Sequence, residues 1–341
     1  MVLKMKFRDL LLLSLALVIC SVSCKKDDDE ETKEYLSGSI KISLQAYVSP
    51  GYTKSFQVDT MSTLSRADGG SIGYYFRVSA FALLDTVKRE NDRVARAFTL
   101  VVPDSLGTFS LQVAGFSTDY YSSSAEAPFT TVIPGHGKGS SITGFDIKDT
   151  DRLFTDPRDK RDYYVFTAGN TEWMRENLAW NGAGVPYNHC DVMSGIFGRF
   201  YTWEEAQNAC PEGWRLPSEN DWQNLALSMG VTGELYESIP GVAGKLMEDV
   251  KFNGSAMWPF ERYVKKTNEA RFSAMPVGYA LTGDGIAKFK DIYSYAVFWS
   301  SDQDKEGGYC RYLYKEQDYL YSGVRDKSSF AASIRCVKDV K

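Results

Sequence analysis

Short apolar runs at close spacing, separated by clusters of turn residues, restrict the first half of the chain to a β fold. Residues 39–44 alternate apolar and polar side chains with a period of two, which is typical of a half-buried strand. Turn-forming clusters at residues 67–70 and 103–107 interrupt such runs. Further runs lie at residues 73–84, 94–102, 108–116 and 129–133. With no clear helical stretch between them, these runs predict an all-β sandwich of about seven strands over residues 38–150.

Charged residues dominate the segment 146–162 and mark a change in the character of the chain. The segment is rich in Asp, Lys and Arg, and it contains Pro157. Such a stretch packs poorly and is typical of a boundary between domains. We therefore predict a domain boundary near residues 150–160, with a second domain over residues 160–341.

Helix and strand signals are mixed in the second domain. Residues 163–166 and 172–178 are the arms of a predicted hairpin around the turn 168–170. Thr202 and Ser218 each precede an acidic residue by three positions, which is the capping box that starts a helix. The other expected elements are a helical turn at residues 242–248 and strands at residues 272–279, 296–300, 309–314 and 331–337. The second domain is therefore expected to be α+β.

The chain begins with the features of a secretory signal peptide over residues 1–23. Basic residues precede the apolar stretch 10–19, whose length of about 10 residues is too short to span a bilayer, which takes roughly 20. The sequence Ser-Val-Ser-Cys that follows resembles the lipobox of bacterial lipoproteins, in which cleavage precedes a lipidated cysteine. Ser21 stands where that motif usually has Leu, and Cys20 is an alternative acceptor. We expect the lipid, with acyl chains such as palmitate, on Cys24.

Residues 24–37 form an acidic stretch directly after this cysteine. The run of acids at residues 27–31 repels itself, so we interpret it as a solvated tether. Acids at this position also resemble the surface-export signal of Bacteroidetes lipoproteins. The lipid supplies the burial that the tether lacks, at about 0.8 kcal/mol per methylene. These features predict a lipid-anchored protein of the outer membrane that faces the cell exterior.

Several sequence blocks of the second domain stand in an order known from one family. They are NL at 177–178, GRFYTWEEA at 198–206, ACPEGWRLPS at 209–218, FSAMPVG at 272–278, FWSS at 298–301 and IRCVKD at 334–339. Together they resemble the Fibrobacter succinogenes major paralogous domain, abundant in Bacteroidetes surface lipoproteins, over roughly residues 162–340. More distantly they look like the formylglycine-generating-enzyme and C-type-lectin superfamily. The resemblance implies a C-type-lectin-like fold, with two helices on small antiparallel sheets and long loops.

Four cysteines follow Cys24 in the chain, and four cysteines allow three disulfide pairings in an oxidising compartment. In the superfamily that the chain resembles, a first-helix cysteine is bridged to the last strand. This implies a Cys210–Cys336 disulfide and leaves Cys190–Cys310 as the second. The alternative is that some of these thiols are buried and reduced.

The same resemblance argues against an enzyme. Formylglycine-generating enzymes use two redox-active cysteines a few residues apart, whereas Cys310 stands alone in the corresponding region. The chain has two histidines, and His189 beside Cys190 has no second such pair to complete a metal site, so we predict neither metal nor cofactor. The loop 282–285 offers one acid, too few for calcium. A net charge of −5 excludes a global basic field for nucleic acid.

These features favour a surface lipoprotein whose second domain is a non-catalytic binding or adhesion module for a glycan or a protein. The binding face is expected on two aromatic-rich loops, residues 252–263 and 288–299. The candidate ligand-binding side chains are Trp258, Phe260, Tyr263, Tyr293 and Tyr295. Each of these aromatics has the alternative of filling the core instead.

A second hypothesis is a fimbrial tip or accessory subunit, in which the β-sandwich of residues 38–150, immunoglobulin-like or fimbrillin-like, joins fimbrial subunits by strand exchange. Arg66, in the loop 62–67, would then be a site of proteolytic maturation. The plain alternative for Arg66 is an exposed loop arginine. An enzyme of the formylglycine-generating type is the third hypothesis.

Overall fold

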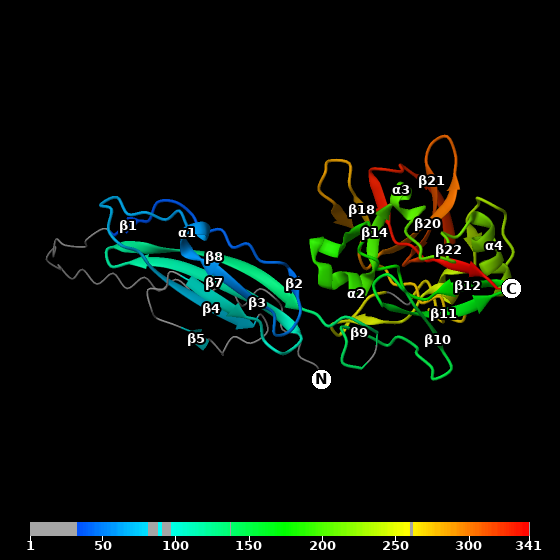
Figure 1. Ribbon diagram of the computed structural model, residues 1–341, viewed down its shortest axis with the longest axis horizontal. Helices are drawn as coiled ribbons and strands as arrows, with labels where there is room; N and C mark the ends of the chain where they lie inside the picture. Colours follow the sequence, from blue (N-terminus) through cyan, green and yellow to red (C-terminus); the bar gives the residue numbers. More distant parts are fainter. Residues whose placement is uncertain (1–32, 81–87, 91–96, 137, 260–261, 341) are drawn as a thin grey trace, which may run out of the picture.

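The computed structural model describes residues 33–80, 88–90, 97–136, 138–259 and 262–340. Over these residues the protein is mostly β, with several sheets and few short helices. Figure 1 shows an elongated sheet in the first half and a mixed α+β second half with a curled sheet. In the described residues, no helix combines the length and the apolar character needed to cross a bilayer. The predicted signal peptide and Cys24 lie outside the described residues.

A six-stranded sheet forms the frame of the first half. Its strands are β1 (Glu34–Tyr35), β2 (Tyr47–Val48), β4 (Gly73–Ala80), β5 (Lys88–Glu90), β7 (Gly107–Ser117) and β8 (Tyr120–Thr131). β7 pairs antiparallel with β4 on one side and with β8 on the other. β1 and β2 both pair in parallel with β8, and β5 pairs with β4. Strand-to-strand hydrogen bonds thus satisfy the backbone here.

A smaller layer covers one face of this sheet. It consists of β3 (Thr53–Gln57), the single-turn helix α1 (Val58–Met61) and β6 (Ala97–Val101), with β3 and β6 antiparallel. Phe56 and Leu100 of this layer belong to the same hydrophobic cluster as Leu111 of the sheet. The rings of Phe76 and Phe98 stack across the two layers with centroids 4.4 Å apart. Burial of these side chains holds the layers together.

The predicted strand at residues 108–116 is confirmed as β7, but two other predictions for the first half differ from the structure. Residues 39–44 form no strand, and only Ile40 makes a β-bridge, to Ser62. Because Ile40 is buried, the alternating pattern indicates burial of its apolar side chain and not pairing with a neighbouring strand. β8 begins at Tyr120, not at residue 129 as predicted. The prediction missed the first part of this strand because polar side chains at its exposed positions weaken the apolar pattern.

The segment between the two halves packs against the second half. β9 (Ile142–Thr143) joins β16 (Lys251–Phe252) and β17 (Ser255–Ala256) in a three-stranded sheet. The side chain of Asn253 donates to the Thr131 carbonyl at 3.2 Å. Part of the charged segment 146–162 is itself a strand, β10 (Arg152–Thr155). The charged residues of this segment therefore do not prevent it from pairing with β11.

Three further sheets build the second half. The first contains β10, β11 (Asp162–Ala168), β12 (Thr171–Met174) and β24 (Val337–Asp339). The second contains β13 (Val185–Pro186), β14 (Arg199–Thr202), β23 (Phe330–Ala332), β18 (Tyr279–Leu281) and β19 (Lys288–Lys290). The third contains β15 (Ile239–Pro240), β22 (Gln317–Arg325), β21 (Gly308–Tyr314) and β20 (Tyr295–Gln303). The β11–β12 hairpin confirms the prediction, and β12 pairs with β24 near the end of the chain.

The described helices of the second half are short. They are η1 (Tyr187–His189), η2 (Asp191–Met193), α2 (Ser194–Phe197), α3 (Trp203–Ala206), α4 (Glu219–Ser228) and α5 (Ala243–Leu246). Both predicted capping boxes are confirmed, with Thr202 and Glu205 starting α3 and Ser218 and Asp221 starting α4. α4 buries Trp222 in the core. The predicted turn at residues 242–248 contains α5.

Two predicted strands are mostly buried loops. Residues 272–278 belong to no strand, and β18 begins only at Tyr279. Residues 333–336 separate β23 from β24. Phe272 and Ile334 are both fully buried. The apolar residues of these two segments therefore indicate burial and not a strand. The backbone of such loops needs hydrogen-bond partners other than strands.

Candidate functional site

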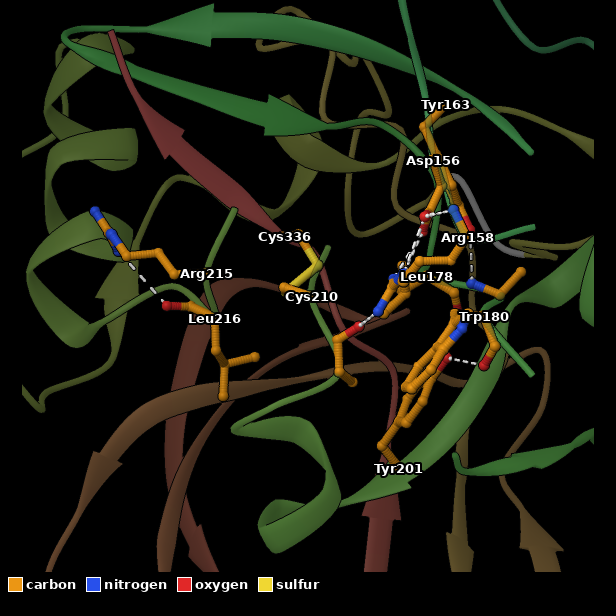
Figure 2. The surroundings of a disulfide bond; sticks show 12 residues. Asp156, Arg158, Tyr163, Leu178, Trp180, Tyr201, Cys210, Arg215, Leu216 and Cys336 are labelled. Atoms are coloured by element: carbon orange, nitrogen blue, oxygen red, sulfur yellow. Dashed lines mark hydrogen bonds and ion pairs between the residues drawn. A yellow bond between two sulfur atoms is a disulfide. The ribbon is translucent and has the colours of Figure 1, made fainter. Parts of the chain in front are cut away.

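A disulfide ties the chain after α3 to the end of the second half. Cys210 and Cys336 are bonded across a sequence separation of 126 residues, as the family resemblance implied. Figure 2 shows Arg158 beside this bridge, between the chain after α3 and Asp156. Its guanidinium donates to the Ala209 carbonyl at 2.8 Å and pairs with the Asp156 carboxylate at 2.7 Å. The bridge and the hydrogen bond from Arg158 to Ala209 therefore hold the same loop from two sides.

The predicted Cys190–Cys310 disulfide is wrong. Both thiols are free and buried in the structure. Cys190 lies in one hydrophobic cluster with Phe197, and Cys310 lies in a different cluster with Trp299. A buried thiol behaves as a small apolar side chain, which the sequence does not distinguish from half of a bridge.

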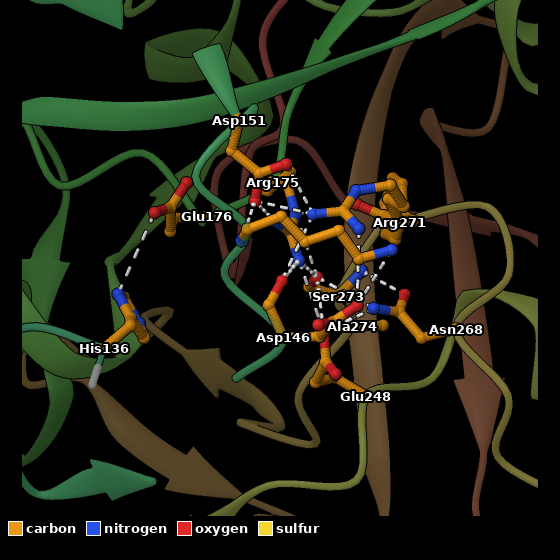
Figure 3. Close-up of polar contacts among 12 residues, drawn as sticks. His136, Asp146, Asp151, Arg175, Glu176, Glu248, Asn268, Arg271, Ser273 and Ala274 are labelled. Carbon is orange, nitrogen blue, oxygen red and sulfur yellow. Dashed lines mark hydrogen bonds and ion pairs between the residues drawn. The ribbon is translucent and has the colours of Figure 1, made fainter. Parts of the chain in front are cut away.

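Arg175 organises a polar cluster inside the second half, and its side chain has no exposed surface. It donates to the Asp151 carboxylate and to the Ser273 hydroxyl, each at 2.9 Å. Arg271 also pairs with Asp151, at 2.6 Å. Figure 3 shows these groups gathered around Arg175, with Glu248 on the other side of Ser273. The cluster binds the segment before β10 to the loop before β18.

Arg335 holds the buried loops themselves. It is fully buried and donates to the Asn177 side-chain oxygen at 2.7 Å. It also donates to the carbonyls of Met174, Phe272 and Ser273 at 3.3, 2.6 and 3.1 Å. Its planar fork thus does for these loops what a neighbouring strand does elsewhere.

The concave site that we define as the aromatic cleft lies on the strands β18 and β20–β23. It has a volume of about 380 Å³. It is lined by Tyr279, Leu281, Asp291, Tyr295, Val297, Cys310, Tyr312, Arg325 and Phe330. Because alternate side chains of a strand point to the same face, these strands bring residues distant in sequence to one surface.

Aromatic rings form the walls of the cleft. Tyr279 stacks on Phe330 with ring centroids 4.9 Å apart. Tyr295 and Tyr312 lie 6.2 Å apart, and Tyr295 also stacks on Tyr314 at 4.8 Å. Tyr279, Tyr295 and Tyr312 are half-buried, so parts of their rings face solvent. Rings held by their neighbours offer a rigid apolar surface to a ligand.

Polar groups stand among these rings. Asp291 and Arg325 are exposed, and the Arg325 guanidinium lies 5.8 Å from the centroid of the Phe330 ring. Burial, and then a hydrogen bond to Asp291, raise the pKa of Tyr279. Burial likewise raises the pKa of Tyr312. Both phenols therefore remain protonated near neutral pH and can donate hydrogen bonds.

The loop beside the cleft is held in an unusual backbone conformation. Asp291 and Tyr293 have positive φ angles of 57° and 66°. Gly278 has φ 73°, and a Cβ at this position would collide with the Lys290 carbonyl oxygen. Only glycine allows this close approach of the two chain segments. Strained residues of this kind concentrate at functional sites.

The comparison with protein families covers the region that carries the cleft. The family model of the Fibrobacter succinogenes major domain matches residues 166–338. The chain belongs to this family. No curated protein and no solved structure matches the chain. The match runs from β11 to β24, so it includes the aromatic cleft and the disulfide of this Fibrobacter succinogenes major domain.

The aromatics predicted from sequence to bind a ligand have different positions in the domain. Tyr295 lines the cleft. Trp258 is wrong as a ligand-binding residue, because it is 1% exposed and its indole N–H donates to the Ala274 carbonyl. Tyr263 is 57% exposed, away from the cleft lining, and Tyr293 packs partly against the core. Phe260 lies outside the described residues.

Sequence reasoning missed most of the cleft. Tyr279 and Tyr312 fall in predicted strands without a predicted role in binding, and Asp291, Arg325 and Phe330 are not singled out. One usable signal was the tyrosine spacing in β21, because residues two apart in a strand share a face. The pairing of β21 with β20, which unites the rings, is a long-range contact that the local pattern does not encode.

The chemistry of the cleft suits binding. Its one thiol, Cys310, is fully buried, and this burial raises its pKa to about 12. A thiol in that state is not a nucleophile near neutral pH, because the thiolate is the reactive form. In the described part of the Fibrobacter succinogenes major domain, no group of three or more His, Cys, Asp or Glu side chains has the arrangement of a metal site.

Proposed function

We propose that this protein is a surface-exposed lipoprotein whose second half is a non-catalytic, C-type-lectin-like module that binds a glycan in the aromatic cleft. The observation that carries the proposal is the concave wall of tyrosine and phenylalanine rings with Asp291 and Arg325 among them. Membership of the Fibrobacter succinogenes major domain family fits this interpretation, since the match includes the cleft.

A sugar ring fits the chemistry of these walls. Its C–H faces are apolar and stack on aromatic rings, whereas its hydroxyl groups need hydrogen-bond partners. The cleft provides rings on Tyr279, Tyr295 and Tyr312, an acceptor on Asp291 and donors on Arg325. Its volume of about 380 Å³ falls in the range of small-molecule sites, roughly 300–1,000 Å³. One or two sugar residues of a longer glycan would occupy it.

The state of the thiols supports binding over catalysis. Catalytic cysteines have lowered pKa values, whereas burial raises the pKa of Cys310 and of Cys190. The two thiols lie in separate clusters, so they are not a pair for redox chemistry. These observations favour a non-enzymatic module.

The first half would act as a spacer in this proposal. Its two β layers are compatible with the β-sandwich expected from sequence, immunoglobulin-like or fimbrillin-like. With acyl chains on Cys24 and the acidic tether, the module would stand away from the outer membrane on the cell exterior. The fimbrial alternative has less support, because the Arg66 side chain is 15% exposed and bound to Asp68 and Ser117. An arginine held in this way is a poor protease site.

Binding to an array of immobilised glycans tests the cleft. We expect Tyr295→Ala and Tyr312→Ala to weaken binding to the best array hit at least tenfold, which corresponds to about 1.4 kcal/mol. Tyr263→Ala is the matched control, because Tyr263 is an exposed tyrosine outside the cleft lining. Equal binding by the cleft variants and the parent, or a loss confined to Tyr263→Ala, would exclude the cleft.

The anchor is tested separately by Cys24→Ala. We expect this variant to lose incorporation of labelled palmitate and to leave the membrane fraction. The parent should be cleaved by protease added to intact cells. Unchanged membrane association of Cys24→Ala would overturn the lipid anchor without touching the glycan proposal.

A further inference from the structure

A second cavity lies where the segment leaving the first half meets the second half, and we call it the junction pocket. It has a volume of about 320 Å³. Its apolar wall includes Pro134, Ile196 and Met275, and its polar groups include His136 and Glu176. It shares no lining residue with the aromatic cleft. His136 lies before the matched family region and Glu176 lies inside it.

Two polar atoms in this pocket lack a hydrogen-bond partner. Within the described residues, neither Oε2 of Glu176 nor Nε2 of His136 has one. Glu176 is 6% exposed. Figure 3 shows the two side chains facing each other, with His136 Nδ1 and Glu176 Oε1 3.9 Å apart, too far for a hydrogen bond. An orphaned buried polar atom costs about 1–3 kcal/mol, so it calls for an explanation.

The two groups do not form an ion pair near neutral pH. Burial raises the pKa of Glu176 to about 8 and lowers the pKa of His136 to about 4. Between these values the carboxyl group is protonated and the imidazole is neutral. Each side chain then has one unpartnered atom, Oε2 of Glu176 and Nε2 of His136, for a hydrogen bond to a guest.

The surrounding charges favour an uncharged guest. The Arg335 guanidinium near Glu176 is committed to Asn177 and to backbone carbonyls, and Arg175 is committed to Asp151 and its neighbours. An anion in the pocket would therefore find these two donors already used, and the charge of the lining residue Arg161 is offset by its neighbour Asp162, which also lines the pocket. A cation would be repelled by Arg335, Arg175 and Arg161, whose charges also lower the pKa of His136.

We propose that the junction pocket binds one neutral, hydroxyl-bearing molecule of the size of a monosaccharide. Its hydroxyl groups would bond to Glu176 Oε2 and His136 Nε2, while its C–H groups contact Pro134, Ile196 and Met275. This site is independent of the glycan proposed for the aromatic cleft. Either site can therefore fail without the other.

Nuclear magnetic resonance of the imidazole groups tests the pocket directly. The chain has two histidines, so protein labelled with ¹⁵N-histidine gives one ring in the pocket and one control ring, His189, which contacts Ala287. The probes are glucose, galactose, mannose and N-acetylglucosamine, each titrated at pH 7. We expect at least one sugar to shift the His136 ring resonances saturably and to leave those of His189 unmoved.

Glu176→Leu is the decisive variant, because it removes the orphaned oxygens and keeps a side chain of similar size. It should fold at least as stably as the parent and bind the active sugar at least tenfold more weakly. No saturable shift with any of the four sugars would overturn the proposal, and the pocket would then hold water only. Equal shifts in Glu176→Leu and the parent would overturn it as well.

Discussion

The two halves of the molecule satisfy their buried backbone in different ways. In the first half the long strands β4, β7 and β8 pair with one another along their length. In the second half buried loops at residues 272–278 and 333–336 run between short strands. Arginine side chains and a disulfide connect these loops. The first half therefore depends on apolar packing of regular strands, and the second on a few directional contacts.

Among the described residues, the fully buried arginines lie in the half that contains the buried loops. Arg175, Arg311 and Arg335 are fully buried, and all three lie in the second half. Arg311 pairs with the buried carboxylate of Glu219. A buried charge is costly unless hydrogen bonds compensate it, so these arginines are retained where carbonyls would otherwise lack donors. Removing a contact of this kind should damage the second half and leave the first intact.

The largest effect is expected from removing the disulfide with the pair Cys210→Ala and Cys336→Ala. The loss should be about 4 to 5 kcal/mol in the chain-entropy model, given the separation of 126 residues. All seven tryptophans lie in the second half, so urea unfolding followed by tryptophan fluorescence reports this half. The buried thiols Cys190 and Cys310 supply the control, because Cys190→Ala removes no bridge. Similar losses in both cases would contradict a structural bridge.

Arg335→Met should come next, with a loss of about 3 to 5 kcal/mol in the same measurement. The substitution leaves the carbonyls of Phe272 and Ser273 and the Asn177 oxygen without this donor. Arg335→Lys is the matched control, because it keeps a charge but loses the planar fork, so an intermediate loss is expected. A neutral effect of Arg335→Met would mean that the loops do not depend on Arg335.

Leu111→Ala probes the other half of the comparison. Leu111 is fully buried in β7, and its truncation should cost about 3 kcal/mol. Hydrogen exchange measured by mass spectrometry should show faster exchange over residues 107–131. Peptides over residues 166–338 and the tryptophan transition should be unchanged. An equal shift of both halves would show that they unfold as one unit.

The sequence predicted local structure best where local signals exist. The capping boxes at Thr202 and Ser218 and the hairpin after residue 163 depend on neighbouring residues, and all are confirmed. The strand predicted at residues 272–279 failed because apolar residues indicate burial equally in a strand and in a buried loop. What distinguishes the two is Arg335, which is 63 residues from Phe272 in sequence.

The candidate site followed the same rule. Tyr295 was recognised because it is an aromatic residue in an aromatic-rich segment, and it lines the cleft. Trp258 met the same criterion but is buried. The prediction failed because the sequence does not reveal which face of the chain packs inward. The partners of Tyr295, on β18, β21 and β23, come together only through long-range strand pairing.

The smallest effect is a pH dependence of the second half. Burial raises the folded-state pKa of Glu176 from 4.5 to about 8, so its stabilising contribution is lost as the pH rises through about 8. Burial lowers the folded-state pKa of His136 from 6.5 to about 4, so its contribution to stability is lost as the pH falls from 6.5 towards 4. Between about pH 4.5 and 6.5 the two effects on the free energy of unfolding oppose each other, because Glu176 lowers it and His136 raises it as the pH rises. Above pH 6.5 only the effect of Glu176 remains.

The free energy of unfolding should therefore fall by about 1 to 2 kcal/mol between pH 6.5 and 8, since one pKa unit corresponds to 1.36 kcal/mol. Glu176→Gln keeps a polar group of the same shape and cannot titrate, so its stability should not show this loss. Urea unfolding with tryptophan detection at both pH values measures the difference. A decline of the same size in Glu176→Gln would assign it to other groups. The orphaned carboxyl would then have no part in the pH response of the second half.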